Sequence, residues 1–420
     1  MEFIVKNMEP VFAKLIILSI LVLAFSSSIC GQDCSGPVDI KKIQAKAVAQ
    51  IPFKISSGLL LVSIRINDSK ELDMHLDTGM SAPIVALFHK EAIDEIGLQN
   101  TQQVILGGAG GSGQKSGHLA QGATVRIGDL VMPNQTIIIM NDTMDTSPWQ
   151  VDGVIGRTIF DSYLTQIDYE TSNITLYDPA SARVSIPLAD AIPISLDLSG
   201  IPTIDTTVNV SGREEKMVKL VLDLGHRNAL FLNTNKTKGI VPPERTLAGI
   251  AGRGIQGEVL STVGRIQEIK LGSYTLRDIP TSFLAEGVNM GLDRTIVDGD
   301  IGQLIFRRFH IILDYKNRRM FLTPNKYFGN PNEFDMAGFG LLEQDRDSIF
   351  VVQHVVENSP AAQNDIRKGD KIVKINGRDV REYDYYQVYD LLRQNGKPIS
   401  LTIARGKERM EKRLTLLRLI

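Results

Sequence analysis

The chain has 420 residues, of which 43% are apolar and 22% charged, and its formal net charge is −2. This composition is typical of a globular protein, and the length is enough for two or three domains. The near-neutral charge gives no reason to expect a nucleic acid or an anionic membrane surface as a partner.

The N-terminal segment, residues 1–30, is expected to be a signal peptide. Lys6 and Lys14 supply positive charge, and the almost wholly apolar run from Leu15 to Phe25 is followed by small residues. These eleven residues are too few to span a bilayer, and the pattern is typical of a signal-peptide core. We therefore expect export to the periplasm, the cell surface or the medium. A retained signal anchor is the alternative.

The two cysteines, Cys30 and Cys34, lie in the expected cleavage region. Cys30 is a candidate lipid anchor, although Ile29 fits poorly the small residue expected before a lipidated cysteine. The rest of the sequence has no cysteine, so it offers neither a disulfide nor a thiol nucleophile.

Two long segments repeat each other at a constant spacing of 146 residues. A lone Asp-X-Gly is a common turn, but several landmarks in one register over about 100 residues indicate a duplication. The matching landmarks are Asp77 and Asp223, Gly79 and Gly225, Asp152 and Asp298, Gly156 and Gly302, Phe160 and Phe306, and Asp168-Tyr169 and Asp314-Tyr315.

Each repeat is dense in Val, Ile, Leu and Thr, in short apolar runs between turn residues, which predicts mostly strands. The run "LLLVSIRINDSKELDMHLD" predicts a hairpin with its turn at Asn67-Asp68, and a helix is expected from Lys90. The repeats cover residues 45–185 and 190–326. A third segment follows at residues 336–420.

The two Asp-X-Gly segments are candidates for a catalytic pair. If the loops meet at a pseudo-twofold axis, their carboxylates share a proton, because two like charges that close cannot both ionise cheaply. The ionised member can then take a proton from water while the protonated member polarises a peptide carbonyl. Gly79 and Gly225 would let the backbone turn tightly enough to present Asp77 and Asp223.

The sequence around Asp77 resembles the retropepsin-like aspartic proteases of the pepsin clan. The run "HLDTGMSAPIV" is similar to that family's active-site turn, and "GVIGRTIF" is similar to the segment that crosses behind it. The resemblance covers both repeats and implies that Asp77 and Asp223 are the catalytic residues. It also implies support of their loops by Thr78, Gly79, Gly225, Gly156 and Gly302.

Two glycine-rich segments resemble the flaps of that family, which are mobile hairpins that close over substrate. The flap residues implied are Gly107, Gly108, Gly110, Gly111, Gly249 and Gly252. Gly108, Gly110 and Gly113 also fit the dinucleotide pattern G-x-G-x-x-G, but the glycines that follow cannot open the helix that this pattern requires. A plain flexible loop is the remaining alternative.

The second loop departs from the family pattern. A Thr or Ser usually stands between Asp and Gly, and its hydroxyl bonds across to the other lobe; Thr78 fits, whereas Leu224 can neither donate nor accept. Small residues usually follow the Gly, but here Met80 and His226 do so. Two alternatives to an active pair stay open: a catalytically silent peptide-binding protein, and a dimer that pairs first lobes across two chains.

From Gly338 onward the sequence resembles the PDZ domains of bacterial proteases. The runs "SPAAQNDIRKGD" and "KINGRDV" and the amphipathic helix "YDYYQVYDLLRQNG" carry the resemblance. It implies that Gly338, Phe339, Gly340 and Leu341 form a loop whose backbone N–H groups capture a peptide C-terminus, while the peptide adds as a strand. A purely structural PDZ-like module is the alternative.

Together these patterns predict a mainly β protein. Two tandem retropepsin-like β-barrel lobes would form an intramolecular pseudo-dimer, followed by an α+β PDZ domain. We expect an aspartic endopeptidase that is a monomer and acts on peptide or protein substrates, without nucleic acid. No metal or other cofactor is expected, because none of the six histidines has metal-binding spacing.

Overall fold

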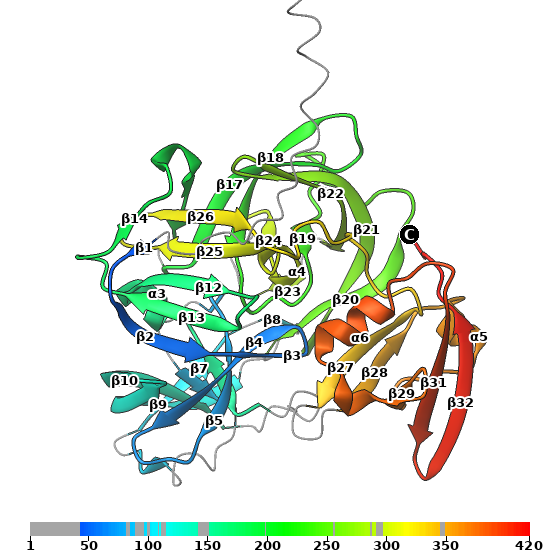
Figure 1. Ribbon diagram of the computed structural model, residues 1–420, viewed down its shortest axis with the longest axis horizontal. Coiled ribbons are helices and arrows are strands. Elements are labelled where there is room, and N and C mark those ends of the chain that lie inside the picture. Colours follow the sequence, from blue (N-terminus) through cyan, green and yellow to red (C-terminus); the bar gives the residue numbers. More distant parts are fainter. Residues whose placement is uncertain are drawn as a thin grey trace, which may run out of the picture. The chain divides into compact units, whose positions relative to one another are not determined.

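The computed structural model describes residues 43–420 apart from residues 81–84, 89–95, 99–100, 108, 111–114, 142–150, 198, 255–256, 286–287, 291–296 and 345–348. The expected signal peptide, both cysteines and most of the helix expected from Lys90 lie outside these residues. The fold is mainly β, as expected (Figure 1). No helix among the described residues is long and apolar enough to cross a membrane.

The first repeat folds into a closed barrel, called here the first barrel. Its strands pair in the order β4-β5-β11-β6-β10-β9, and β9 pairs back onto β4, while β3 and β7 extend the sheet. Their bounds are β3 Lys54–Ser56, β4 Leu59–Ile66, β5 Leu72–Leu76, β6 Val85–Leu87, β7 Gln102–Leu106, β9 Lys115–Ile127, β10 Leu130–Met140 and β11 Gly153–Ile155.

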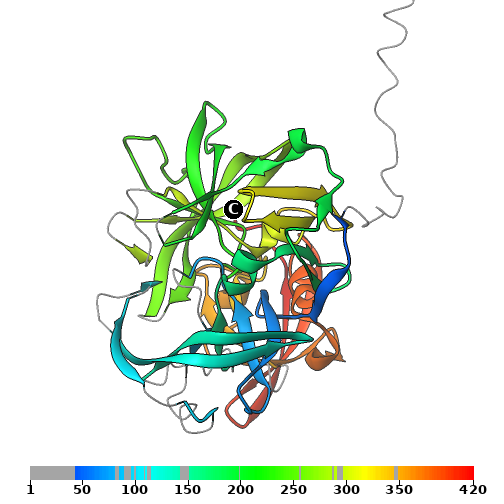
Figure 2. The same cartoon turned by 90° about the vertical axis from the view of Figure 1, so that its left-hand side faces the viewer.

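The second repeat forms the second barrel in the same way. Its strand order is β17-β18-β24-β19-β22-β21, and β21 pairs back onto β17, while β16 and β20 extend the sheet. The bounds are β16 Ser195–Leu196, β17 Pro202–Asn209, β18 Glu215–Leu222, β19 Leu230–Asn233, β20 Leu247–Gly254, β21 Gly257–Leu271, β22 Tyr274–Leu284 and β24 Gly299–Ile301. Figure 2 shows these green strands above the blue and teal strands of the first barrel.

Both repeats contribute strands to a third sheet, the shared sheet, in the order β15-β26-β25-β12-β13-β2. At its centre β12 pairs antiparallel with β25, and Gln166 lies opposite Ile312, its own repeat mate 146 residues later. The pairing is therefore symmetric about this point, which places a pseudo-twofold axis between the repeats. The bounds are β2 Ala47–Pro52, β12 Leu164–Asp168, β13 Asn173–Tyr177, β15 Ile192–Pro193, β25 Phe309–Asp314 and β26 Arg319–Pro324.

The strands follow from the alternation of apolar and polar residues along the sequence. In β4 the side chains of Ile64 and Ile66 are buried and that of Arg65 is exposed, because successive side chains of a strand point to opposite faces. Asn67 then turns the chain with φ 51°, a left-handed conformation that Asn tolerates better than most residues. The hairpin expected at Asn67-Asp68 is confirmed.

Short elements complete the two repeats. One-turn helices follow β11 and β24, and small strand pairs join β1 with β14 and β8 with β23. Their bounds are α3 Thr158–Ser162, α4 Gln303–Phe306, β1 Ile43–Gln44, β14 Arg183–Val184, β8 Ala109–Gly110, β23 Asn289–Met290 and the 3-10 turn η1 Leu188–Asp190.

The C-terminal segment forms a separate apolar core under a sheet ordered β27-β28-β29-β31-β32, with β30 beside β29. Asp384 caps α6 in a capping box with Gln387, which fixes where this helix begins. The bounds are β27 Phe339–Gln344, β28 Ile349–Val355, β29 Lys371–Ile375, β30 Arg378–Asp379, β31 Pro398–Arg405, β32 Glu408–Thr415, α5 Pro360–Gln363, α6 Tyr385–Leu391 and η2 Val380–Glu382.

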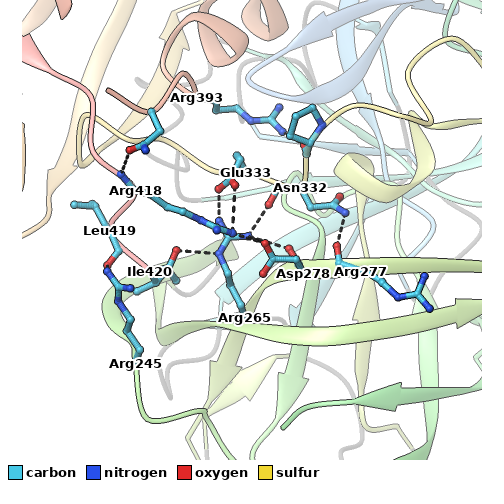
Figure 3. A network of polar contacts seen from close by, with 12 residues as sticks. Arg245, Arg265, Arg277, Asp278, Asn332, Glu333, Arg393, Arg418, Leu419 and Ile420 are labelled. Atoms are coloured by element: carbon cyan, nitrogen blue, oxygen red, sulfur yellow. Dashed lines mark hydrogen bonds and ion pairs between the residues drawn. The ribbon is translucent and has the colours of Figure 1, made fainter. Parts of the chain in front are cut away.

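A polar network joins this C-terminal domain to the second barrel (Figure 3). Its centre is Arg265 of β21, which donates to the backbone oxygens of Ile420 (3.0 Å) and Asn332 (2.6 Å) and pairs with Glu333. The Arg265 side chain is largely buried, at 11% exposure. A buried cation needs such partners, so this network fixes the tail and the linker on the barrel.

Candidate active site

Asp77 and Asp223 occupy equivalent places in the two barrels. Asp77 follows β5, which pairs in parallel with the short strand β11. Asp223 follows β18, which pairs in parallel with the short strand β24. The backbone N–H of Asp77 donates to Ile155, and that of Asp223 to Ile301, both at 3.0 Å. The loops therefore leave their barrels with the same geometry.

The two loops meet through their glycines. A Cβ atom added at Gly79 would lie 2.9 Å from Cγ of Asp223, and one added at Gly225 would lie 2.6 Å from Cγ of Asp77. Any larger residue would therefore push the opposite carboxyl group away. The structure brings the two aspartates together, and their side chains share a hydrogen bond.

The protein environment acts differently on the two acids. Burial raises the pKa of Asp77, but N–H groups of Gly79 and Met80 and the hydrogen bond from Asp223 oppose this. Burial raises the pKa of Asp223 well above its usual range, the neighbouring acids Asp77 and Asp300 raise it further, and His226 and the N–H group of Gly225 oppose this. These shifts favour a shared proton on Asp223 and the negative charge on Asp77.

Thr78 ties the first loop to the second. Its hydroxyl donates to the backbone oxygen of Leu222 at 2.6 Å and accepts from the backbone N–H of Leu224 at 2.9 Å. Both partners belong to the other lobe, as the family resemblance implies for a hydroxyl at this position. Leu224 is buried at 3% exposure and offers no matching hydroxyl in return.

A buried polar pair lies beside Asp223 and has no counterpart in the first lobe. Nδ1 of His226 is 2.5 Å from Oδ1 of Asp300, and both side chains are almost inaccessible. Their repeat mates are Met80 and Val154. Burial lowers the pKa of His226 to about 4 and raises that of Asp300 well above its usual range, so burial favours the neutral form of both side chains.

Sequence reasoning did not single out Asp300. The sequence signal that could have identified it is that Asp300, in a short buried strand, is the repeat mate of the apolar Val154. The pair also explains Gly302, because a Cβ there would lie 2.3 Å from the carbonyl oxygen and 2.7 Å from Nδ1 of His226. Gly156 takes the equivalent place between β11 and α3.

The segments interpreted as flaps lie on hairpins of both barrels. Gly107 follows β7, and Gly110 ends β8, which pairs with β23 of the second repeat. Gly249 and Gly252 lie within β20, which pairs with β21. Gly108 and Gly111 lie outside the described residues.

The loop predicted to capture a peptide C-terminus is already engaged within the chain. The carboxylate of Asp335 accepts from the N–H groups of Gly338 and Phe339, both at 2.6 Å, and from that of Ala337 at 3.1 Å. Gly340 packs against the ring of His354, because a Cβ atom added at Gly340 would lie 2.2 Å from Cε1 of that ring. Sequence reasoning missed Asp335, which stands three residues before the loop.

The space between β27 and α6, called here the PDZ groove, opens on a cavity of about 130 Å³ that the second barrel also lines. Leu341 and Val388 line it from the PDZ side, and Ala229 and Leu247 from the barrel. At the far end of β27, the hydroxyl of Ser57 bonds both the N–H and the oxygen of Glu343. The groove is therefore bounded by both repeats.

In the part of the chain that the structure describes, no group of three or more His, Cys, Asp or Glu side chains is arranged to hold a metal ion. The equivalent acids Asp152 and Asp298 accept from backbone N–H groups of Asp73 (2.8 Å) and Lys219 (3.0 Å). They serve as matching structural anchors behind the two loops.

Comparison with known proteins gives matches of three kinds. A curated "Probable CtpA-like serine protease" of Staphylococcus haemolyticus (strain JCSC1435) is 25% identical over 146 residues, which is 34% of this chain. This chain thus spans 28% of that protein's length. A crystal structure of an aspartic proteinase from Irpex lacteus matches 67% of this chain and 98% of its own, at 14% identity and a TM-score of 0.41.

Two family models match separate parts of the chain. Residues 62–159, which include Asp77 and Gly156, match the family described as aspartyl protease. Residues 351–405 match the PDZ domain. The chain thus carries a retropepsin-like aspartyl-protease region and a PDZ domain in one polypeptide.

Proposed function

We propose that the protein is an aspartic endopeptidase, with Asp77 and Asp223 as its catalytic pair. The observation that carries the proposal is the reciprocal approach of each loop glycine to the opposite carboxyl group. This arrangement lets two acids share one proton and act on opposite sides of a peptide bond.

The asymmetry between the acids supports a different role for each. Asp77, the ionised member, takes a proton from a water molecule whose oxygen attacks the peptide carbonyl carbon. Asp223 gives its proton to the carbonyl oxygen, so the product of this step is a gem-diol with no covalent bond to the protein. The nitrogen of the scissile bond then takes the proton from Asp77, and Asp223 recovers its own as the C–N bond breaks.

Cleavage of an unstructured protein substrate by purified variants tests this assignment. Asp77→Asn and Asp223→Asn should each lower kcat about a thousandfold, since each removes one partner of the proton transfer. Asp205→Asn is the control, because it removes a carboxylate of β17 that pairs with Lys219 at the surface. Unchanged cleavage by Asp77→Asn would refute the proposal.

Inhibitors separate this chemistry from that of a serine peptidase. A statine-containing transition-state mimic should block cleavage, and a serine-directed fluorophosphonate should not. If Asp223→Asn keeps full activity while Asp77→Asn loses it, first lobes pair across two chains instead. If neither variant changes binding of the statine compound, the lobes only hold peptide.

The location proposed for this activity is outside the cytoplasm, which the N-terminal apolar segment supports. Fractionation of cells that express the full chain tests it: the processed protein should leave the cytoplasmic fraction, and deletion of residues 1–30 should retain it there.

A further inference from the structure

Only one of the two Asp-X-Gly loops has a hydroxyl that bonds across to the other loop. Thr78 bonds to both neighbours of Asp223, but Leu224, its repeat mate, cannot return these bonds. The second loop must nevertheless stay in place, because an error of about 1 Å in a catalytic group is enough to cost rate.

A different polar chain reaches the second loop from the first repeat. The Tyr169 hydroxyl, just after β12, donates to Oε1 of Gln303 at 2.7 Å. Nε2 of Gln303 donates in turn to the backbone oxygen of Leu224, also at 2.7 Å. Gln303 has no accessible surface and Tyr169 is 6% exposed, so water does not compete for these bonds.

We propose that Tyr169 and Gln303 are positioning residues that replace the missing hydroxyl and hold the Asp223 loop against the first repeat. This inference rests on the proposed peptidase function for its catalytic consequence. We call these two hydrogen bonds the tie. Like the Thr78 bonds, the tie joins the two repeats, but it ends on the carbonyl oxygen of Leu224 and not on its N–H group.

The repeat mates of these residues make no equivalent tie. Arg157, the mate of Gln303, directly precedes α3 and pairs with Asp161 of that helix at 2.5 Å. The hydroxyl of Tyr315, the mate of Tyr169, is buried without a hydrogen-bond partner among the described residues. The tie is therefore present on the side where the loop hydroxyl is absent.

The surroundings of Tyr169 keep it a hydrogen-bond donor. Its ring packs edge-on against Phe53 with centroids 5.8 Å apart, which fixes its direction. Burial raises the pKa of its hydroxyl well above the usual value, and nearby Tyr386 adds to this while Arg307 opposes it. Arg307 in turn lies 3.6 Å from the centre of the Tyr386 ring, so helix α6 covers the outer end of the tie.

Kinetics of two substitutions test the catalytic consequence. Tyr169→Phe and Gln303→Leu should each lower kcat about tenfold and leave KM nearly unchanged, since neither residue touches substrate. Tyr315→Phe is the matched control, because it removes an equally buried hydroxyl that makes no hydrogen bond to any described residue. Adding Leu224→Thr to Tyr169→Phe should restore most of kcat, since it returns a hydroxyl to the loop.

Hydrogen exchange tests the tie without relying on activity. Tyr169→Phe should speed exchange of the backbone amides at residues 222–226, Tyr315→Phe should not, and Leu224→Thr should reverse the effect. Equal exchange in Tyr169→Phe and the unsubstituted protein overturns the proposal. If exchange responds as expected but no variant cleaves peptide, the tie stands and the proposed peptidase function fails.

Discussion

At the scale of single residues, the surroundings of Asp223 differ from those of Asp77 at Leu224, His226 and Asp300. The difference at Leu224 removes polar contacts, whereas His226 and Asp300 add a polar pair where the first lobe has Met80 and Val154. A buried polar pair is stable only while both members are present, because either one alone lacks a partner in a water-poor site.

A double-mutant cycle on this pair can use the first lobe's residues, with Met in place of His226 and Val in place of Asp300. His226→Met and Asp300→Val should each destabilise the fold by about 2 kcal/mol, since each leaves a buried polar group without its partner. The double variant, which copies the first lobe, should cost less than the sum by at least about 1 kcal/mol. Urea unfolding measures all four states. Additive losses would show that the two side chains are not coupled.

At the scale of elements, Asp335 shapes the turn that leads into β27. Its carboxyl accepts three backbone N–H groups, yet burial still raises its pKa from 3.8 to about 7. Because part of the predicted carboxylate-binding loop already holds this acid, a peptide C-terminus would have to compete with it. The groove is thus engaged at one end by Asp335 and at the other by Ser57.

The raised pKa predicts how stability depends on pH. Between about pH 4 and pH 7 the unfolded chain has released this proton while the folded chain keeps it, so folding is favoured at low pH. Stability should therefore fall as pH rises through this window. Asp335→Asn should flatten the slope of the unfolding midpoint against pH, whatever it does to the midpoint itself.

The control for this slope is Asp384→Asn, which changes an exposed aspartate of the same domain that can still cap α6 as asparagine. It should leave the slope as it is. An unchanged slope in Asp335→Asn would show that this carboxyl does not hold its proton in the folded state.

At the scale of the whole molecule, the C-terminal domain packs on both repeats. Ser57 contacts it from the first repeat and Arg227 from the second, and Arg265 anchors its tail and linker. Arg227 follows Asp223 by four positions and donates to Gln353 of β28 at 2.8 Å. Arg227 also lines the cavity of the PDZ groove, so this groove lies next to the segment that follows Asp223.

Loss of the Arg265 network should uncouple the domain from the second barrel. Arg265→Ala leaves Glu333 without its buried cation and should weaken the contact by about 3 kcal/mol. Calorimetry should then resolve two unfolding transitions where the unsubstituted protein shows one. Arg277→Ala is the control, because its side chain is 72% exposed. A single transition in Arg265→Ala would contradict this role.

The sequence by itself determined the architecture, because the architecture follows from periodic patterns along the chain. Strand alternation, the constant spacing of 146 residues and the landmarks of two families predicted a mainly β chain with two barrels and a PDZ domain. The same spacing predicted that Asp77 and Asp223 are equivalent. The domain boundaries and the catalytic roles remain predictions.

The tertiary structure decided which groups compensate for the departures from those patterns. Gln303 and Tyr169 are 134 residues apart, and no local pattern tells that they meet at the carbonyl of Leu224. The pairing of His226 with Asp300 and the capture of loop N–H groups by Asp335 are equally invisible in sequence. The physical reason is that burial and hydrogen bonding of a polar group depend on what packs around it, whereas strand periodicity is a property of the chain alone.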